Sequence, residues 1–152
     1  MRRLLLLLCL LPVQIWAQDA KLYVKCLPNE PVQLKWFTPT LVSEGGVIVY
    51  RSVNGGAFER INNSPIKVGE QTLPSSATQE EQDLAAYISD PGFTWGQNPV
   101  MTVVLIQKLI ASNAVCASIG TYFKDNNTPE NANVRYRVVE LVDGQEVEIG
   151  TT

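Results

Sequence analysis

The spacing of apolar side chains changes twice along this chain, and that change constrains the fold more than any other feature. In residues 21–61 and again in 134–149, apolar and polar side chains alternate, which is typical of half-buried β-strands. Between these segments, apolar residues recur at helical spacing. Strands that each have one apolar face must pack as two sheets around a shared core. We therefore predict a mostly β antiparallel sandwich with an α-helical insertion at about residues 75–120.

Two turn dipeptides predict β-hairpins within the alternating segments. Asn54-Gly55 follows the apolar run 47–52, and Asp143-Gly144 divides 134–142 from 145–149. Asn-Gly and Asp-Gly pairs tolerate the positive φ angles of a type I′ turn. We interpret the basic residues of these hairpins as the solvent-facing side of a sheet and not as catalytic groups. They are Arg51, Arg60, Arg135 and Arg137.

Helix-capping signals mark the inserted segment. Residues 78–81 form a Thr-x-x-Glu capping box, and the helical run that follows stops at Asp90-Pro91-Gly92. A second helix is predicted over 98–111, with Asn as N-cap and Pro as first helical residue, although its β-branched content would also suit a strand. A third, short helix is predicted over 113–119. Because these helices are apolar, we expect them to cover a sheet edge or face.

The first 17 residues have the pattern of a secretory signal peptide. Arg2 and Arg3 precede the apolar run 4–11, which is too short for a membrane span, and Ala17 supplies a small residue at the expected cleavage site. Cleavage would leave 18–152 as one domain that does not span a membrane and is secreted, periplasmic or on the cell surface. Without Arg2 and Arg3, 10 basic side chains remain against 15 acidic ones, a formal net charge of −5.

Composition excludes several classes of function. Histidine is absent, which removes the usual Ser–His and Cys–His arrangements and His-based metal sites. The acidic charge balance lacks the basic footprint of a nucleic-acid-binding protein. The segment Asp125–Thr128 offers oxygen ligands but not the spaced acidic ligands of an EF-hand, so a polar turn is favoured over a calcium site. We accordingly expect no enzyme activity, no metal and no cofactor.

Two cysteines remain once the leader, which contains Cys9, is removed. An even number of cysteines in an exported protein allows a disulfide between Cys26 and Cys116, provided that the two Cβ atoms meet. The alternative is two buried free thiols that act as small hydrophobic side chains. The sequence leaves both alternatives open.

Three aromatic residues of the insertion form a candidate interaction patch. Phe93 and Trp95 lie in the loop between the first two predicted helices, beside Tyr87. Aromatic loop residues stack on sugar rings or anchor protein interfaces at a small cost in conformational entropy. The same side chains would also hold the insertion against the sandwich, and we favour this structural role.

The strand segments contain a set of short motifs in a defined order. They are Leu34-Lys35-Trp36, Val49-Tyr50-Arg51-Ser52, Asn54-Gly55-Gly56, Phe123, Asp125, Pro129 and Tyr136-Arg137-Val138. Together they resemble the fibronectin type III fold in the form common in bacterial exported proteins. The chain departs from that family at Glu130, where glycine is usual, and at Val134, where the family has a tyrosine that ties a loop to a strand. The resemblance implies an immunoglobulin-like sandwich over 18–152, interrupted by the helical insertion.

Leader, fold and composition together predict a role in binding. We expect a secreted, non-enzymatic interaction or spacer module of a bacterial envelope or extracellular assembly, whose partner is a protein or a neighbouring domain. The alternative is a carbohydrate-binding module that holds a polysaccharide with the loop aromatics around Trp95. Fold alone does not separate these two functions, because function depends on the site carried by the fold.

Overall fold

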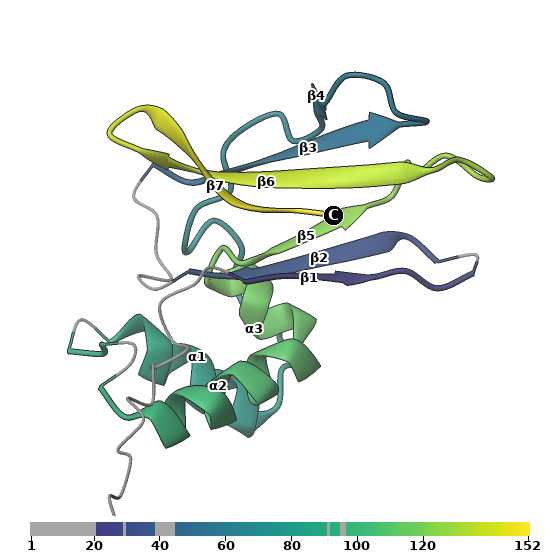
Figure 1. Ribbon diagram of the computed structural model, residues 1–152. Helices are drawn as coiled ribbons and strands as arrows, with labels where there is room; N and C mark the ends of the chain where they lie inside the picture. The colour runs from purple at the N-terminus through teal and green to yellow at the C-terminus, as the bar shows by residue number, and fades with distance from the viewer. Residues whose placement is uncertain (1–20, 29, 39–44, 91, 95–96) are drawn as a thin grey trace, which may run out of the picture.

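The structure is a computed structural model that describes residues 21–28, 30–38, 45–90, 92–94 and 97–152. The predicted signal peptide lies outside the described residues. Within them, seven strands and three helices form two antiparallel sheets and a helical layer (Figure 1). No helix in this part of the chain has the length and apolar character that a membrane crossing requires.

The strands form the two layers expected of a sandwich. The three-stranded sheet has the order β1-β2-β5, and the four-stranded sheet has the order β4-β3-β6-β7. All pairings between these neighbouring strands are antiparallel. The strands are β1 (Lys21–Lys25), β2 (Val32–Phe37), β3 (Val47–Val53), β4 (Glu59–Arg60), β5 (Tyr122–Asp125), β6 (Val134–Val142) and β7 (Gln145–Thr151). The prediction of a mostly β structure with two antiparallel sheets is confirmed.

Both predicted hairpin turns are present. Asn54 and Gly55 have φ angles of 51° and 77°, and Asp143 and Gly144 have φ angles of 50° and 77°. Two consecutive residues with positive φ are the signature of a type I′ turn. The first turn leads from β3 to β4, which has only two residues, and the second joins the longer β6 and β7.

The predicted sandwich core lies between the two sheets. The alternation in β2 directs Val32, Leu34 and Trp36 into this core, and Trp36 is only 1% exposed. Residues of the facing sheet complete the cluster: Val47, Val49, Tyr136, Val138 and Ile149. Burying a large aromatic side chain contributes several kcal/mol, to judge from the roughly 3–5 kcal/mol lost when one is truncated.

The regular secondary structure between β4 and β5 consists of helices. Helices α1 (Gln79–Ser89), α2 (Pro99–Ala111) and α3 (Asn113–Ser118) lie between β4 and β5 in the chain. The capping box forms as predicted, and the Asn98 side chain accepts a hydrogen bond from the Met101 N–H. The β-branched segment after Asn98, which would also have suited a strand, forms the helix α2. Its N-cap and its first-turn proline favour helix initiation.

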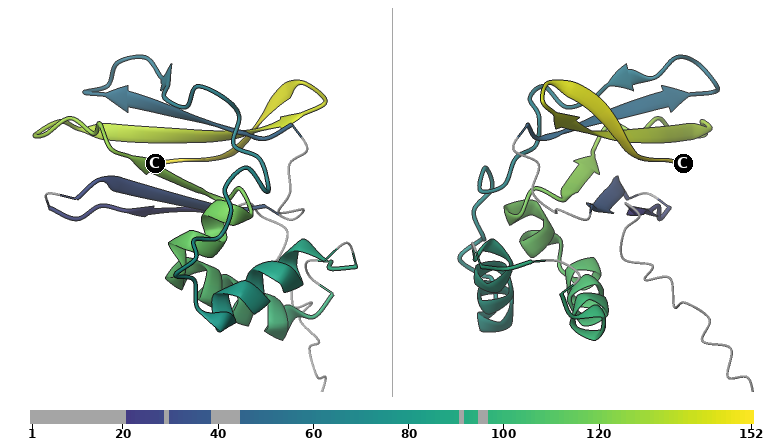
Figure 2. Two further views of the ribbon diagram at one scale, coloured as in Figure 1. Left: turned by 180° about the vertical axis from the view of Figure 1, so that it is seen from behind. Right: turned by 60° about the vertical axis from the view of Figure 1, so that its left-hand side comes forward.

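A second core joins the helices to the three-stranded sheet. Figure 2 shows the helices on the side of that sheet that faces away from β3 and β6. Phe37 points to this side and packs in a cluster with helical residues. The helical members are Leu84, Ala85, Ile88, Leu105, Leu109, Val115 and Cys116, and Ile119 follows α3. The expectation that the helices cover a sheet face is confirmed.

A buried lysine helps to hold α2 on the sheet. The Lys35 ammonium donates hydrogen bonds to the carbonyl oxygens of Leu109 (3.1 Å) and Ile110 (2.5 Å). The last carbonyls of a helix have no partner within the helix, and a cation is favourable there. Burial lowers the pKa of Lys35, which reflects the cost of removing its charge from water.

The prediction that all four hairpin arginines face solvent is wrong for Arg51. Its guanidinium points between the sheets and pairs with the Asp125 carboxylate at 2.9 Å, and the two side chains are 21% and 5% exposed. The Tyr136 hydroxyl donates to the same carboxylate at 2.9 Å. Arg51 follows Val47 and Val49 on the inner side of β3, at the end of the sandwich, where a buried carboxylate from the other sheet is available.

This polar cluster also anchors the loop between β5 and β6. The Tyr136 hydroxyl contacts the Thr128 hydroxyl at 3.3 Å, and Arg51 donates to the Asn127 carbonyl oxygen at 2.7 Å. Burial, together with the hydrogen bond to Asp125, raises the pKa of Tyr136 to about 12. Burial alone would raise the pKa of Asp125, but hydrogen bonds from Arg51, Tyr136 and the Asn127 N–H lower it. Tyr136 thus ties the β5–β6 loop to β6.

Cys26 and Cys116 are not paired in the structure. Cys26 is an exposed free thiol that follows β1, whereas Cys116 is a free thiol buried in the helical cluster. The alternative of two buried thiols therefore holds only for Cys116. Its Sγ atom lies 3.0 Å from the Leu109 carbonyl oxygen, and burial raises the pKa of this thiol.

We predict that Asp125→Asn lowers the free energy of unfolding at pH 7 by about 3 kcal/mol, because Arg51 loses its ionic partner. The folded-state pKa of Asp125 lies below the unfolded value, so its stabilising effect is present above about pH 4 and is lost as the pH falls further. Urea unfolding of both proteins at pH 7 and pH 3 measures this. The difference between them should shrink at pH 3. A loss no larger than that of the exposed control Asp83→Asn would contradict the prediction.

We predict that Lys35→Met loosens the C-terminal turn of α2, because the carbonyl oxygens of Leu109 and Ile110 lose a charged donor. The expected loss of stability is about 1–3 kcal/mol. Relative to the wild type, the variant's amide hydrogen exchange should be accelerated more in α2 than in β3 and β6. The matched control is Lys25→Met, which changes an exposed lysine of the same sheet and should leave exchange in α2 unaltered.

Candidate functional site

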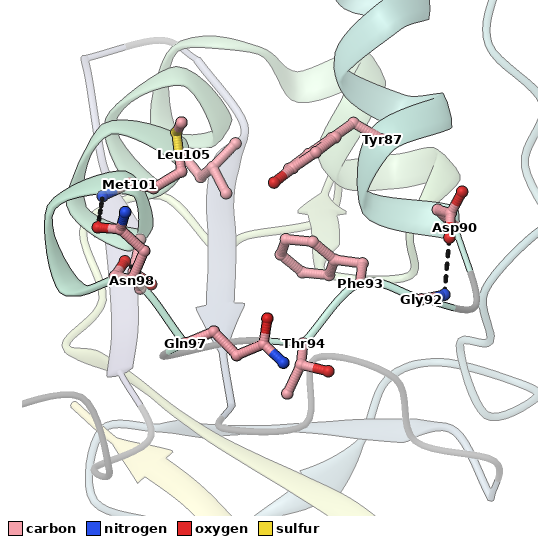
Figure 3. A pocket seen from close by; sticks show the side chains of 10 residues that line it. Tyr87, Asp90, Gly92, Phe93, Thr94, Gln97, Asn98, Met101 and Leu105 are labelled. Atoms are coloured by element: carbon pink, nitrogen blue, oxygen red, sulfur yellow. Dashed lines mark hydrogen bonds between the residues drawn. The ribbon is translucent and has the colours of Figure 1, made fainter.

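The insertion contains a pocket between the end of α1 and the start of α2. Its volume is about 360 Å³, within the range of small-ligand sites. Figure 3 shows Tyr87 from α1 on one side, Met101 and Leu105 from α2 on the other, and the connecting segment along the base. The connecting residues that line it are Asp90, Gly92, Phe93, Thr94, Gln97 and Asn98.

The structure brings together two of the three predicted patch residues. The rings of Tyr87 and Phe93 meet edge to face with their centroids 5.2 Å apart. Phe93 is partly buried and packs against the cluster that contains Phe37 and the buried helical residues. Tyr87 is 50% exposed and presents one side of its ring to the pocket. Trp95, the third predicted residue, lies outside the described residues.

Part of the polar lining of the pocket already serves the backbone. The Asp90 carboxylate accepts a hydrogen bond from the Gly92 N–H at 2.6 Å, and Asn98 caps α2. Thr94 and Gln97 are exposed and line the same side of the pocket (Figure 3). The pocket therefore combines one exposed aromatic ring with a small number of polar groups along its base.

Helix α2 is apolar on both of its faces. Leu105 and Leu109 are buried against the helical cluster, while Val100 and Val103 on the opposite side are 75% and 57% exposed. We define the α2 stripe as Val100, Val103, Val104 and Ile110, which are all exposed and lie on one side of the helix together with the uncharged Gln107. The α2 stripe was not predicted from the sequence, although the four consecutive apolar residues 103–106 place apolar side chains on more than one side of the helix.

No ionic group interrupts the α2 stripe. The one charged residue of α2, Lys108, forms an ion pair with Glu80 of α1. This ion pair joins α2 to α1. Lys108 lies one helical turn after Val104, so the pair runs along the margin of the stripe and not through it. The stripe is thus an uncharged surface that continues through Met101 to the pocket.

A larger hollow of about 780 Å³ lies away from the helices, at the end of the sandwich where the β1–β2 turn and the β5–β6 loop meet. Cys26 lines it, together with Asp125 and Tyr136, whose polar atoms bond to each other. Among the described residues, no three His, Cys, Asp or Glu side chains converge as metal ligands would. The segment Asp125–Thr128 is a turn that begins at a carboxylate already held by Arg51.

We predict losses of stability of different size for the two described aromatics of the patch. Phe93→Ala should lower the free energy of unfolding by about 2–4 kcal/mol, because it removes a ring that packs on the helical cluster. Tyr87→Ala should cost less than about 1 kcal/mol, because half of the ring is already in water. Thermal and urea unfolding of the two variants measure this difference. Equal losses would show that Tyr87 also serves mainly in packing.

Comparison of the chain with protein-family models, with curated proteins and with solved structures finds no match in any of the three. Function is therefore inferred from the residues and their geometry. The two features that stand out are the α2 stripe and the pocket at its N-terminal end.

Proposed function

We propose that this chain is an exported, non-enzymatic interaction module of a bacterial envelope or extracellular assembly, and that its helical insertion binds a protein partner or a neighbouring domain. One observation carries the proposal, namely the α2 stripe. Val100 and Val103 are largely exposed on a helix whose other face is already buried in the protein core. Exposed apolar side chains that gather on one side of a helix mark interaction sites.

The proposed fold is a fibronectin type III-like, immunoglobulin-like sandwich. Its support is the strand order, in which β2 neighbours β5 and β3 neighbours β6. In the immunoglobulin constant arrangement, the first, second and fifth strands share one sheet with the fourth, and the third, sixth and seventh share the other. The present order differs only in β4, which pairs with β3. The helices then occupy the stretch between the fourth and fifth strands.

Apolar burial explains why the stripe would bind. Transfer of apolar side chains from water contributes roughly 25 cal/mol per Å² of buried area, so several partly exposed valine and isoleucine side chains supply a few kcal/mol together. The stripe carries no charge that would have to be desolvated. A matching apolar segment of a partner protein fits this surface better than a charged or strongly hydrated one.

A polysaccharide is the second candidate ligand, and the pocket favours it. Tyr87 offers a half-exposed ring, and Thr94 and Gln97 offer hydrogen-bonding groups beside it. Sugar recognition commonly combines an aromatic platform with a few polar groups. In this alternative, Tyr87→Ala would abolish binding while substitutions on the α2 stripe would not.

We predict that Val103→Glu abolishes binding of the partner without unfolding the protein, because it places a charge in the middle of an apolar interface. The full chain is expressed with its own leader in the native envelope, with a tag at its C-terminus. Chemical crosslinking, purification and mass spectrometry then identify the bound polypeptides and glycans. The wild-type protein should retain one polypeptide in stoichiometric amount.

Two controls make this experiment decisive. Lys124→Glu places a carboxylate on an exposed residue of β5, changes the net charge by more than Val103→Glu does, and should still retain the partner. Circular dichroism should be the same for both variants and the wild type. If Val103→Glu retains the polypeptide, the α2 stripe is not the binding surface. If the wild type retains a glycan that Tyr87→Ala loses, the carbohydrate alternative replaces the protein-binding proposal.

A further inference from the structure

The outer face of the four-stranded sheet carries a cluster of arginine and aromatic side chains. The Arg137 guanidinium lies over the Tyr50 ring, 4.7 Å from its centroid, and also over the Phe58 ring at 5.3 Å. The Arg135 guanidinium also lies over the Phe58 ring, 5.9 Å from its centroid. We call this set, with Arg60, the arginine face. It is on the opposite side of the sandwich from the helices (Figure 1).

Strand register places these residues together. Tyr50 of β3 pairs with Arg60 on one side and with Arg137 on the other, so the three side chains form one row across the sheet. Arg135 lies two positions from Arg137 along β6 and points to the same face, since side chains on one face recur at every second residue. Two residues of a strand span roughly 6.6–6.8 Å.

None of these three arginines has a carboxylate partner within the described part of the chain. The two ion pairs found there are those of Arg51 with Asp125 and of Lys108 with Glu80. Arg60 donates instead to backbone carbonyl oxygens of the loop that follows β4, and Arg135 donates to the carbonyl oxygen of Thr152.

Arg137 is the least satisfied member of the arginine face. Its Nε atom is buried and has no hydrogen-bond partner among the described residues. Buried donors without partners are rare and call for an explanation. The nearest aromatic hydroxyl, that of Tyr50, donates to Glu146. Cation–π contact holds the Arg137 plane in place without using any of its five N–H donors.

The remainder of the protein has the opposite charge. The whole chain has a net charge of −3, yet Arg60, Arg135 and Arg137 lie together on one face. Guanidinium groups bind carboxylates through two parallel hydrogen bonds, and stacked guanidiniums lose little freedom when they do so. The net negative charge of the chain opposes the approach of a dense polyanion more strongly than that of a ligand with a few spaced carboxylates.

We propose that the arginine face binds an acidic, extended segment of a partner polypeptide, with carboxylates at alternate positions. An extended peptide repeats side chains on one face at the same two-residue spacing that separates Arg135 from Arg137. Its carboxylates pair with the guanidiniums, the methylene groups of the same side chains contact Tyr50 and Phe58, and its intervening side chains point away from the sheet. This surface is separate from the α2 stripe, so the module would contact two partners from opposite sides of the sandwich.

Fluorescence anisotropy of a labelled peptide of alternating Glu and Thr tests this proposal on the full chain. Binding is expected at low ionic strength and should weaken as salt is added, because the attraction is between charges. The double variant Arg135→Gln/Arg137→Gln should weaken binding by about tenfold or more. The matched control Lys25→Gln/Lys124→Gln removes two cations from the other sheet and should change the affinity less than about twofold.

A conservative variant separates binding geometry from net charge. Arg137→Lys keeps the charge but loses the planar fork and its stacking, so affinity should fall several-fold while the fold, followed by circular dichroism, is retained. A peptide of alternating Gln and Thr should not bind. Val103→Glu should bind the acidic peptide as the wild type does, which separates this proposal from the one for the α2 stripe.

Several results would overturn the proposal. The acidic peptide could bind both double variants equally, or not bind at all. Inorganic polyphosphate or a sulfated polysaccharide could bind more tightly than the peptide at equal salt, which would assign the face to another class of anion. Sedimentation could also show a dimer that the arginine double variant abolishes, in which case a second copy of this chain occupies the face.

Discussion

Strand β2 is buried on both sides, and the rest of the structure depends on this. Its inner face sends Trp36 into the core between the sheets, and its outer face sends Phe37 and Lys35 into the helical layer. A strand with two buried faces can hold two cores at once. Both the sandwich and the insertion are therefore anchored on the same six residues, and the helices are an integral layer of the domain.

This anchoring explains why the insertion can expose apolar surface. The helices are attached to the sheet through one cluster, which contains Leu105 and Leu109 and against which Phe93 packs. Val100 and Val103 lie outside this cluster and are exposed to water. Exposed apolar side chains on a rigid helix lose little freedom on binding, which favours association. The arginine face has a comparable property, because stacking on Tyr50 and Phe58 holds the guanidiniums in place before any ligand arrives.

The two proposed surfaces differ in chemistry as well as in position. The α2 stripe is apolar and uncharged, and its binding should respond weakly to salt. The arginine face is cationic, and its binding should fall as ionic strength rises. A module with such surfaces on opposite sides of a sandwich is suited to joining two components of an assembly. Its binding to each component can be measured and altered independently.

Features set by neighbouring residues were predictable from the sequence. The turns at Asn54-Gly55 and Asp143-Gly144, the capping box of α1 and the inward alternation of β2 each depend on contacts within a few residues. The inward position of Arg51 and the use of Lys35 at the end of α2 were not predictable. Their partners, Asp125 and Leu109, each lie 74 positions away along the chain. Only the tertiary structure decides such pairs, because packing of the two sheets and the helical layer determines which distant polar groups are buried together.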